Sequence, residues 1–111
     1  MAALKYNDMP VTQINAGTER RLGYTDNLMI VIVDFSDGPK DEPDPPHTHP
    51  HEQVSYVAEG EVIFVLEDEK THLKAGDVFL VPPDKAHSVQ LLTERVRLID
   101  CFTPLREDFL E

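Results

Sequence analysis

Three histidines lie within five residues of this chain, in a proline-rich segment: His47, His49 and His51. A neutral imidazole is the commonest nitrogen ligand for a divalent metal ion, and side chains two positions apart in an extended segment point to the same face. His47 and His49 therefore form a candidate chelating pair. Gln53 shares their parity, so its side-chain carbonyl oxygen is a third candidate donor if the strand continues past Pro50.

A fourth donor has to come from another part of the chain, and His87 is the best candidate. It ends a second turn-rich segment that begins at Gly76. The alternative for the first segment is a solvated loop, because a histidine-rich loop beside prolines often has no function of its own. His72 follows an acidic turn and is expected at the surface.

The two segments, about residues 45–60 and 76–91, resemble the paired motifs of the cupins, which are small β-barrels that hold one metal ion. The first cupin motif is G-x5-H-x-H-x3or4-E-x6-G, and this chain has His47-x-His49-x3-Gln53-x6-Gly60. The second is G-x5-P-x-G-x2-H-x3-N, and this chain has Gly76-x5-Pro82-x-Asp84-x2-His87 before Leu91. The resemblance implies that His47, His49, Gln53 and His87 hold one divalent ion.

The departures from the cupin pattern differ in their consequences. Gly38 precedes His47 by more residues than the motif allows, which predicts a longer loop before the histidines. Asp84 replaces a turn glycine and tolerates a left-handed backbone, and Leu91 replaces a polar residue that need not touch the metal. Gln53 in place of Glu leaves the ion its full double positive charge, which favours an anionic, oxygen-rich substrate. Such a site accepts zinc, nickel, manganese or iron.

The elements that must position these residues are short strands separated by turn signals, with no window of helical periodicity. The segment 28–35 is expected to be a central strand buried on both faces, and 54–66 a hairpin that turns at Glu59-Gly60. Residues 38–46 form a loop, and the tail 105–111 forms a helical turn. Further strands are expected at 11–14, 71–73, 78–81, 87–92 and 95–102. The chain 1–111 is thus predicted to be one all-β domain, a cupin jelly-roll barrel.

Asp100 lies in the last predicted strand, on the same side as Leu98 and Phe102. An ionised carboxylate in an apolar layer is unfavourable unless a partner compensates its charge, and a cation in the barrel cavity would do so. In the alternative, Asp100 pairs with Arg97 or Arg106 at the rim of the barrel.

The C-terminal sequence Asp100-x-Phe102-x-Pro104-x-Arg106 is similar to that of the pectin-degradation cupins of the KdgF type. Those proteins open the ring of 4,5-unsaturated uronate monosaccharides to give linear 5-keto-4-deoxyuronate. The resemblance implies proton transfer by Asp100, binding of the substrate carboxylate by Arg106, and contact of Phe102 with the sugar ring. His51 matches no ligand of the family and is expected at the rim, beside the substrate.

Two further functions remain open at this point. One is a cupin that binds a sugar or another metabolite without turnover, in which Asp100 and Arg106 are structural. The other is a metal-dependent dioxygenase, which requires bound iron and consumes oxygen. Metal analysis and the fate of an unsaturated uronate distinguish the three.

Composition restricts the partners of the chain. A formal net charge of −11 at pH 7 opposes binding to nucleic acid and to anionic membrane surfaces. The single cysteine, Cys101, forms no internal disulfide, and the N-terminal residues lack the apolar run of a signal peptide, so a cytoplasmic location is expected. Apolar residues at both parities of 28–35 and 54–66 exceed what the inside of a small barrel needs, which predicts a homodimer.

Overall fold

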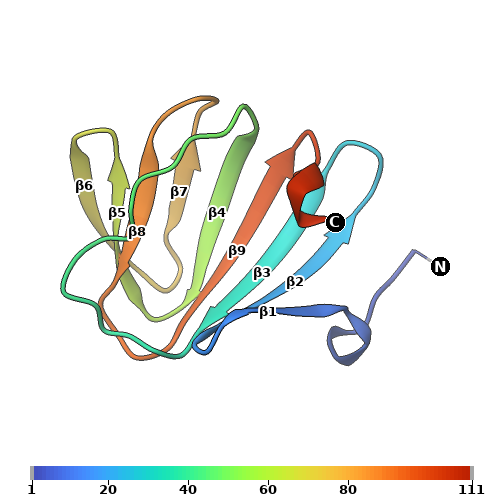
Figure 1. Cartoon of the computed structure of the whole chain (residues 1–111), viewed down its shortest axis with the longest axis horizontal. Coiled ribbons are helices and arrows are strands. Elements are labelled where there is room, and N and C mark those ends of the chain that lie inside the picture. Colours follow the sequence, from blue (N-terminus) through green and yellow to red (C-terminus); the bar gives the residue numbers. More distant parts are fainter. Residues whose placement is uncertain (1, 111) are drawn as a thin grey trace.

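The computed structural model describes residues 2–110 as a sandwich of antiparallel strands with two 3-10 helical turns (Figure 1). The turns are η1 (Tyr6–Asp8) and η2 (Glu107–Phe109). The strands are β1 (Val11–Asn15), β2 (Thr18–Tyr24), β3 (Met29–Phe35), β4 (Glu52–Glu59), β5 (Glu61–Leu66), β6 (Glu69–Lys74), β7 (Val78–Val81), β8 (His87–Leu91) and β9 (Val96–Thr103).

The strands form two sheets. The larger has the order β1-β2-β3-β9-β4-β7, and the smaller has the order β6-β5-β8. Buried apolar side chains from both sheets meet in one cluster, contributed by Val57, Val62, Phe64, Phe79, Val81, Leu91, Val96 and Leu98. A smaller cluster of Met29, Val31 and Phe102 lies between β3 and β9. The jelly-roll barrel predicted from the sequence is therefore confirmed.

The predicted hairpin over residues 54–66 is wrong, because β4 and β5 lie in different sheets. β4 pairs with β7 and β9, whereas β5 pairs with β6 and β8. The turn signal at Glu59-Gly60 marks the corner where the chain passes from one sheet to the other. Gly60 has φ +84°, and a side chain there would overlap the carbonyl oxygen of Arg95.

The prediction for residues 28–35 is correct in position and wrong in burial. β3 lies inside the larger sheet, between β2 and β9, but its outward-facing Ile30 is 41% exposed. The strand β2 was not predicted at all. Its residues Glu19, Arg20 and Arg21 break the apolar pattern, yet all seven of its residues pair with β3.

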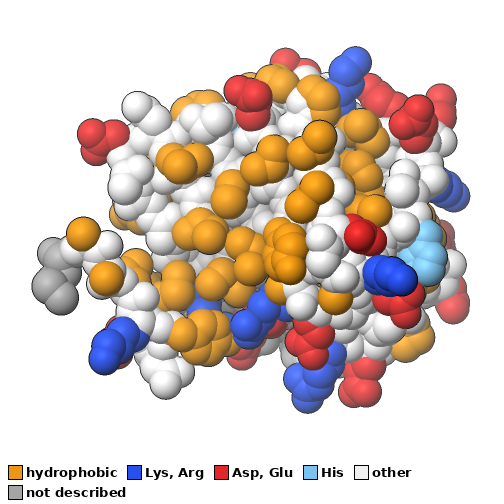
Figure 2. Space-filling model, turned by 180° about the vertical axis from the view of Figure 1, so that it is seen from behind, with side chains coloured by type: hydrophobic (Ala, Val, Ile, Leu, Met, Phe, Trp, Pro, Cys, Tyr) orange, Lys and Arg blue, Asp and Glu red, His pale blue; other side chains and the backbone are white. Residues whose placement is uncertain are grey.

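The outer face of the larger sheet carries exposed apolar side chains on three strands, as the space-filling view from behind shows (Figure 2). We call this set the outer apolar face, and it consists of Ile30, Val54, Tyr56, Val78 and Leu80.

None of the helices in residues 2–110 has the length and apolarity that crossing a membrane requires.

Candidate metal centre and active site

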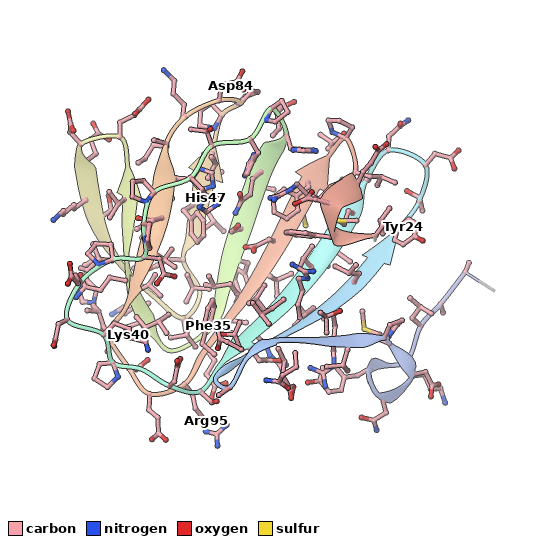
Figure 3. All side chains as sticks on the ribbon, viewed as in Figure 1. Tyr24, Phe35, Lys40, His47, Asp84 and Arg95 are labelled. Atoms are coloured by element: carbon pink, nitrogen blue, oxygen red, sulfur yellow. The ribbon has the colours of Figure 1, made fainter. Side chains whose placement is uncertain are left out.

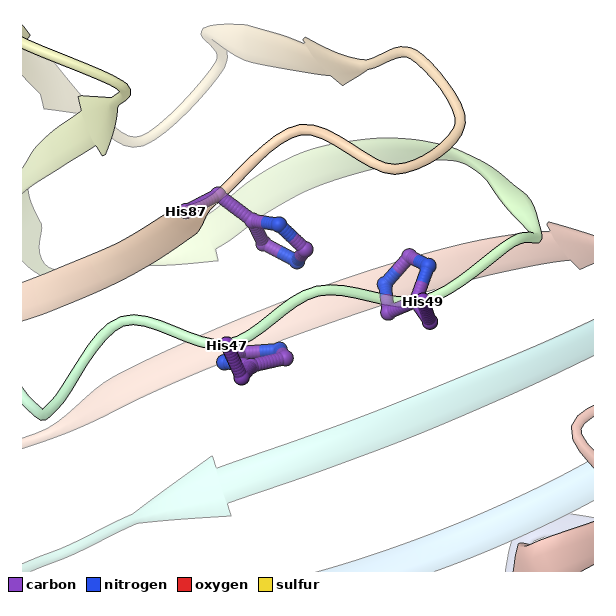
Figure 4. A group of neighbouring side chains, drawn as sticks. All are labelled: His47, His49 and His87. Carbon is purple, nitrogen blue, oxygen red and sulfur yellow. The ribbon is translucent and has the colours of Figure 1, made fainter.

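Three histidine rings converge between the two sheets: His47 and His49 from the loop before β4, and His87 from the start of β8 (Figures 3 and 4). Their ligand atoms all lie within 4.8 Å of one another. The ring centroids of His47 and His87 are 4.2 Å apart, and those of His49 and His87 are 4.7 Å apart. The sequence prediction that these three residues come together is confirmed.

Backbone hydrogen bonds hold the loop against β8 and so place the histidines. His47 and His87 form an antiparallel bridge in which each N–H donates to the other's carbonyl oxygen at 3.0 Å. The backbone amides of Lys40 and Asp44 donate to the carbonyl oxygens of Leu91 and Val89 on β8. On the other side, the Asp84 amide donates to the His49 carbonyl at 2.9 Å, from a turn in which Asp84 has φ +65°. The left-handed conformation expected of Asp84 is thus confirmed.

Hydrogen bonds also orient two of the rings. His49 Nδ1 donates to the His51 carbonyl at 3.1 Å, and His87 Nδ1 donates to the Lys85 carbonyl at 2.8 Å. In a neutral imidazole with a protonated Nδ1, Nε2 carries the lone pair. Both Nε2 atoms therefore present lone pairs to the same space, and among the described residues His87 Nε2 is buried without a hydrogen-bond partner.

The surroundings of His47 and His87 favour the neutral form of these two rings. Loss of solvent around the ring, with His87 and His49 nearby, lowers the pKa of His47 to about 4. Burial likewise lowers the pKa of His87, although its bond to the Lys85 carbonyl acts in the opposite direction. Because a metal ion binds the unprotonated imidazole, both shifts favour binding at neutral pH.

Gln53 completes the group from the first residues of β4, where it is 7% exposed. Its Oε1 lies 3.0 Å from His49 Nε2. Two lone-pair atoms this close repel each other unless a cation lies against both. Two donors that each lie about 2.1 Å from one ion would be about 3 to 3.5 Å apart, so His49 and Gln53 could both hold one metal ion.

Asp100 faces this cluster from β9. Asp100 is partly buried, and its carboxylate accepts a hydrogen bond from Ser55 Oγ at 2.6 Å. Desolvation raises the pKa of Asp100 to about 6, against the opposing effects of Ser55 and Arg106. Arg97 does not pair with Asp100, because its guanidinium binds Asp34 at 2.7 and 3.1 Å. Asp100 lines the same cavity as His47 and His87.

Arg106 reaches the same cavity from the C-terminal segment. Its Nε and Nη2 donate to the two carboxylate oxygens of Asp108 at 3.1 and 2.9 Å. The Phe109 ring lies between two guanidinium groups, with Arg20 Cζ 3.9 Å and Arg106 Cζ 4.2 Å from its centroid. These cation–π contacts fix the segment over the larger sheet.

Phe102 and His51 both lie beside the His49 ring. Phe102 is 3% exposed, and its ring meets the His49 ring edge to face, with centroids 5.6 Å apart. His51 Nε2 donates to the Leu105 carbonyl at 3.0 Å, which ties the first motif to the C-terminal segment. The histidine group itself consists of His47, His49 and His87, and His72 is exposed, as predicted.

A cavity of about 220 Å³ joins these groups. His47, Gln53, His87, Asp100 and Arg106 all line it. Sequence reasoning missed Ser55, Arg20 and Phe109. Ser55 could have been found, because it follows Gln53 at the same parity and so faces inward on β4.

A family model described as Cupin domain matches residues 34–102. The pectin degradation protein KdgF of Dickeya dadantii (strain 3937) is 38% identical to this chain over 106 residues, which are 94% of this chain and 94% of that protein.

Two solved structures are similar over almost the same length. KdgF from Halomonas sp. gives a TM-score of 0.84 at 32% identity, with 95% of this chain and 96% of that chain covered. An RmlC-like cupin from Shewanella frigidimarina NCIMB 400 gives a TM-score of 0.82 at 36% identity, with 98% and 99% covered. Both the family model and these relatives show that the chain belongs to the cupin family.

Proposed function

We propose that this cupin opens the ring of 4,5-unsaturated uronate monosaccharides to linear 5-keto-4-deoxyuronate, in the breakdown of pectin or alginate. The observation that carries the proposal is the placement of Asp100. This carboxyl group has a pKa of about 6 and shares one cavity with His47, His87 and Arg106. The similarity to KdgF, named as a pectin degradation protein, supports the substrate class.

In this proposal His47, His49, Gln53 and His87 hold one divalent ion, which is zinc, nickel, manganese or iron. When bound, the ion acts as a Lewis acid toward substrate oxygens. The neutral amide of Gln53 leaves that ion its whole positive charge, whereas a glutamate ligand would cancel half of it. The four residues therefore favour an anionic sugar over a neutral one.

Asp100 moves the proton. Its carboxylate takes the proton of the anomeric hydroxyl, and the carbonyl at C1 forms as the bond between C1 and the ring oxygen breaks. The electron pair of that bond leaves an enolate over the ring oxygen, C5 and C4. Asp100 then returns the proton to C4, so the product is an isomer of the substrate. A group that must both accept and donate works best with a pKa near the operating pH.

Arg106 binds the carboxylate of the uronate. Its Nε and Nη2 already hold a carboxylate in a two-pronged arrangement, that of Asp108, which shows that this face of the guanidinium accepts such a group. The substrate carboxylate would replace Asp108 there. Phe102 forms the apolar wall beside the sugar, and His51 stands at the rim near Leu105.

The test is incubation of the purified protein with a 4,5-unsaturated uronate, with and without prior removal of metal by a chelator. We expect the ultraviolet absorbance of the double bond to disappear faster than without protein, and NMR to identify the linear ketone. Binding without acceleration would favour a non-catalytic metabolite-binding protein. Oxygen consumption by the iron-loaded protein would favour a dioxygenase.

We also propose that two copies pair through the outer apolar face. Its five side chains lie on adjacent or nearby strands of one sheet, and each is between 41% and 60% exposed. A patch of this kind on one continuous sheet matches itself across a twofold axis. The acidic surface elsewhere would resist other contacts between like chains.

A further inference from the structure

A buried row of hydrogen-bonding groups runs along the inner face of β4 from the metal centre to Asp100. His49 Nε2 lies 3.0 Å from Gln53 Oε1, and Gln53 Nε2 donates to Ser55 Oγ at 2.9 Å. Ser55 Oγ in turn donates to Asp100 Oδ1 at 2.6 Å. Ser55 is 3% exposed and lies directly opposite Asp100 in the pairing of β4 with β9.

The chemistry of a hydroxyl group gives this row a direction. A serine hydroxyl has one proton, and Ser55 gives it to Asp100. Its oxygen is then left to accept, so Gln53 must turn its NH₂ group toward Ser55. The amide oxygen consequently faces His49. Rotation of the amide by half a turn would instead place two N–H donors against the His49 lone pair, and an amide NH₂ is no metal ligand.

We propose that Ser55 is the positioning residue of the metal centre, because it fixes which end of the Gln53 amide faces the three histidines. It also holds the Asp100 carboxylate at one rotamer, so one hydroxyl aligns both the ligand and the proton carrier. The proposal rests on the metal site and on the role of Asp100 proposed above. Groups that orient metal ligands typically contribute about 10- to 100-fold in affinity or activity.

The first experiment measures metal affinity by competition with a chromophoric chelator, using zinc and nickel, in Ser55→Ala and in Ser55→Thr. We expect Ser55→Ala to bind about tenfold or more weakly and Ser55→Thr, which keeps a hydroxyl, to recover much of that loss. Thr18→Val is the matched control, since it removes a buried hydroxyl from β2, outside the lining of this cavity. An equal loss in Ser55→Ala and Thr18→Val would overturn the proposal.

A double-mutant cycle with Gln53→Glu separates orientation from simple loss of packing. A carboxylate has an oxygen at both ends, so nothing needs to choose between them. Removal of the Ser55 hydroxyl should therefore weaken metal binding by less than about threefold in the Gln53→Glu background. If Ser55→Ala has the same effect in both backgrounds, Ser55 has no orienting role.

A third measurement needs neither metal nor substrate. In the metal-free protein, the side-chain amide protons of Gln53 should exchange slowly with water in NMR spectra, and should shift and exchange faster in Ser55→Ala. Unchanged signals would contradict the proposal. All three readouts are independent of uronate turnover, so they remain valid if the wild-type protein fails to open the sugar ring.

Discussion

The two faces of β4 reverse the usual distribution of side chains. On the inner face Gln53 is 7% and Ser55 is 3% exposed, so polar groups are buried. On the outer face of the same strand Val54 is 52% and Tyr56 is 44% exposed, so apolar groups meet solvent. Only at its far end, where Val57 is fully buried, does the strand follow the ordinary rule.

The reversal shows that the two faces have different tasks. Burial of polar groups is unfavourable unless each finds a partner, and the inner groups find one another. The outer side chains are left about half exposed by residues 2–110, and they contribute more to stability when another surface covers them. The apolar cluster around Val57 and Phe64 holds the sheets together, which leaves the inner polar end free for chemistry.

The largest expected effect is on the inner face, in His49→Ala and His87→Ala. Each should abolish stoichiometric metal binding, because each removes a ring oriented by a backbone carbonyl. The fold should persist, since neither residue belongs to the apolar clusters. Mass spectrometry measures the metal content, and circular dichroism checks that the fold is retained. Substitution of the exposed His72 by alanine is the control. Full metal content in both variants would disprove the assignment.

Asp100→Asn tests the proton carrier. It keeps the size of the side chain and should keep the fold and the metal, but turnover of unsaturated uronate should fall by about 10²- to 10⁴-fold. In the wild type, kcat/KM should decline as the pH falls through the pKa of Asp100, because the base must be ionised to take the anomeric proton. Wild-type turnover in Asp100→Asn would make this carboxyl group structural; Asp68→Asn, in an exposed turn, is the control.

Asp100→Asn should lower turnover but raise the free energy of unfolding at neutral and alkaline pH. A carboxyl group whose pKa rises from 3.8 to about 6 on folding favours the folded chain at low pH. That contribution is lost as the pH rises from about 4 through about 6, and asparagine has no such dependence. Metal-free Asp100→Asn should therefore be more stable than the wild type at pH 8, by on the order of 2–3 kcal/mol, and no more stable at pH 3.5. Thermal denaturation at both values measures this.

On the outer face, Leu80→Lys should separate the proposed dimer into monomers without unfolding them. Leu80 is 60% exposed in the single chain, so the substitution removes little from the core. In a symmetric pair each substitution occurs twice, and loss of about 1.5–3 kcal/mol at each copy raises the dissociation constant at least 10²-fold. Light scattering at micromolar concentration gives the mass. Thr71→Lys on β6 is the control, and a monomeric wild type would refute the dimer.

The smallest expected effect is that of Asp108→Asn. It removes the charge of the carboxylate now bound to Arg106, so the substrate carboxylate meets less competition. Because Asp108 is largely exposed, its pair with Arg106 is worth little, and KM should fall only about two- to fivefold with kcat unchanged. Steady-state kinetics measure KM and kcat. Glu107→Gln, which removes a neighbouring negative charge, is the control. A higher KM would mean that Asp108 helps to hold Arg106 in place.

The sequence predicted the histidine cluster better than it predicted the strand pairing. The His47-x-His49 spacing is local, so an extended segment places both rings on one face. His87 lies far along the chain and was predicted from the resemblance to the second cupin motif. The pairing of β4 depends instead on β9, which pairs with it from Glu52↔Thr103 to Glu59↔Arg97. Nothing in residues 54–66 distinguishes a hairpin from a corner between sheets. Charge at Glu19, Arg20 and Arg21 concealed β2 in the same way, because its place is determined by β3.

The burial of β3 was misjudged for a physical reason. A run of apolar residues at both parities is typical of a strand covered on both sides, whether by its own chain or by another. The sequence of residues 28–35 does not say which. Likewise, the row from Gln53 through Ser55 to Asp100 joins two strands, and no single segment reveals it.

The reciprocal bridge between His47 and His87 also bears on the order in which the molecule assembles. His47 precedes β4 of the larger sheet, and His87 opens β8 of the smaller one. An ion bound there would link the two sheets. Its ligands would come together only once both sheets have formed and packed against each other. Metal affinity would then depend on how well the two sheets pack together at the histidines. Removal of the metal by a chelator should increase amide hydrogen exchange near His47 and His87 before it does so near the apolar cluster around Val57.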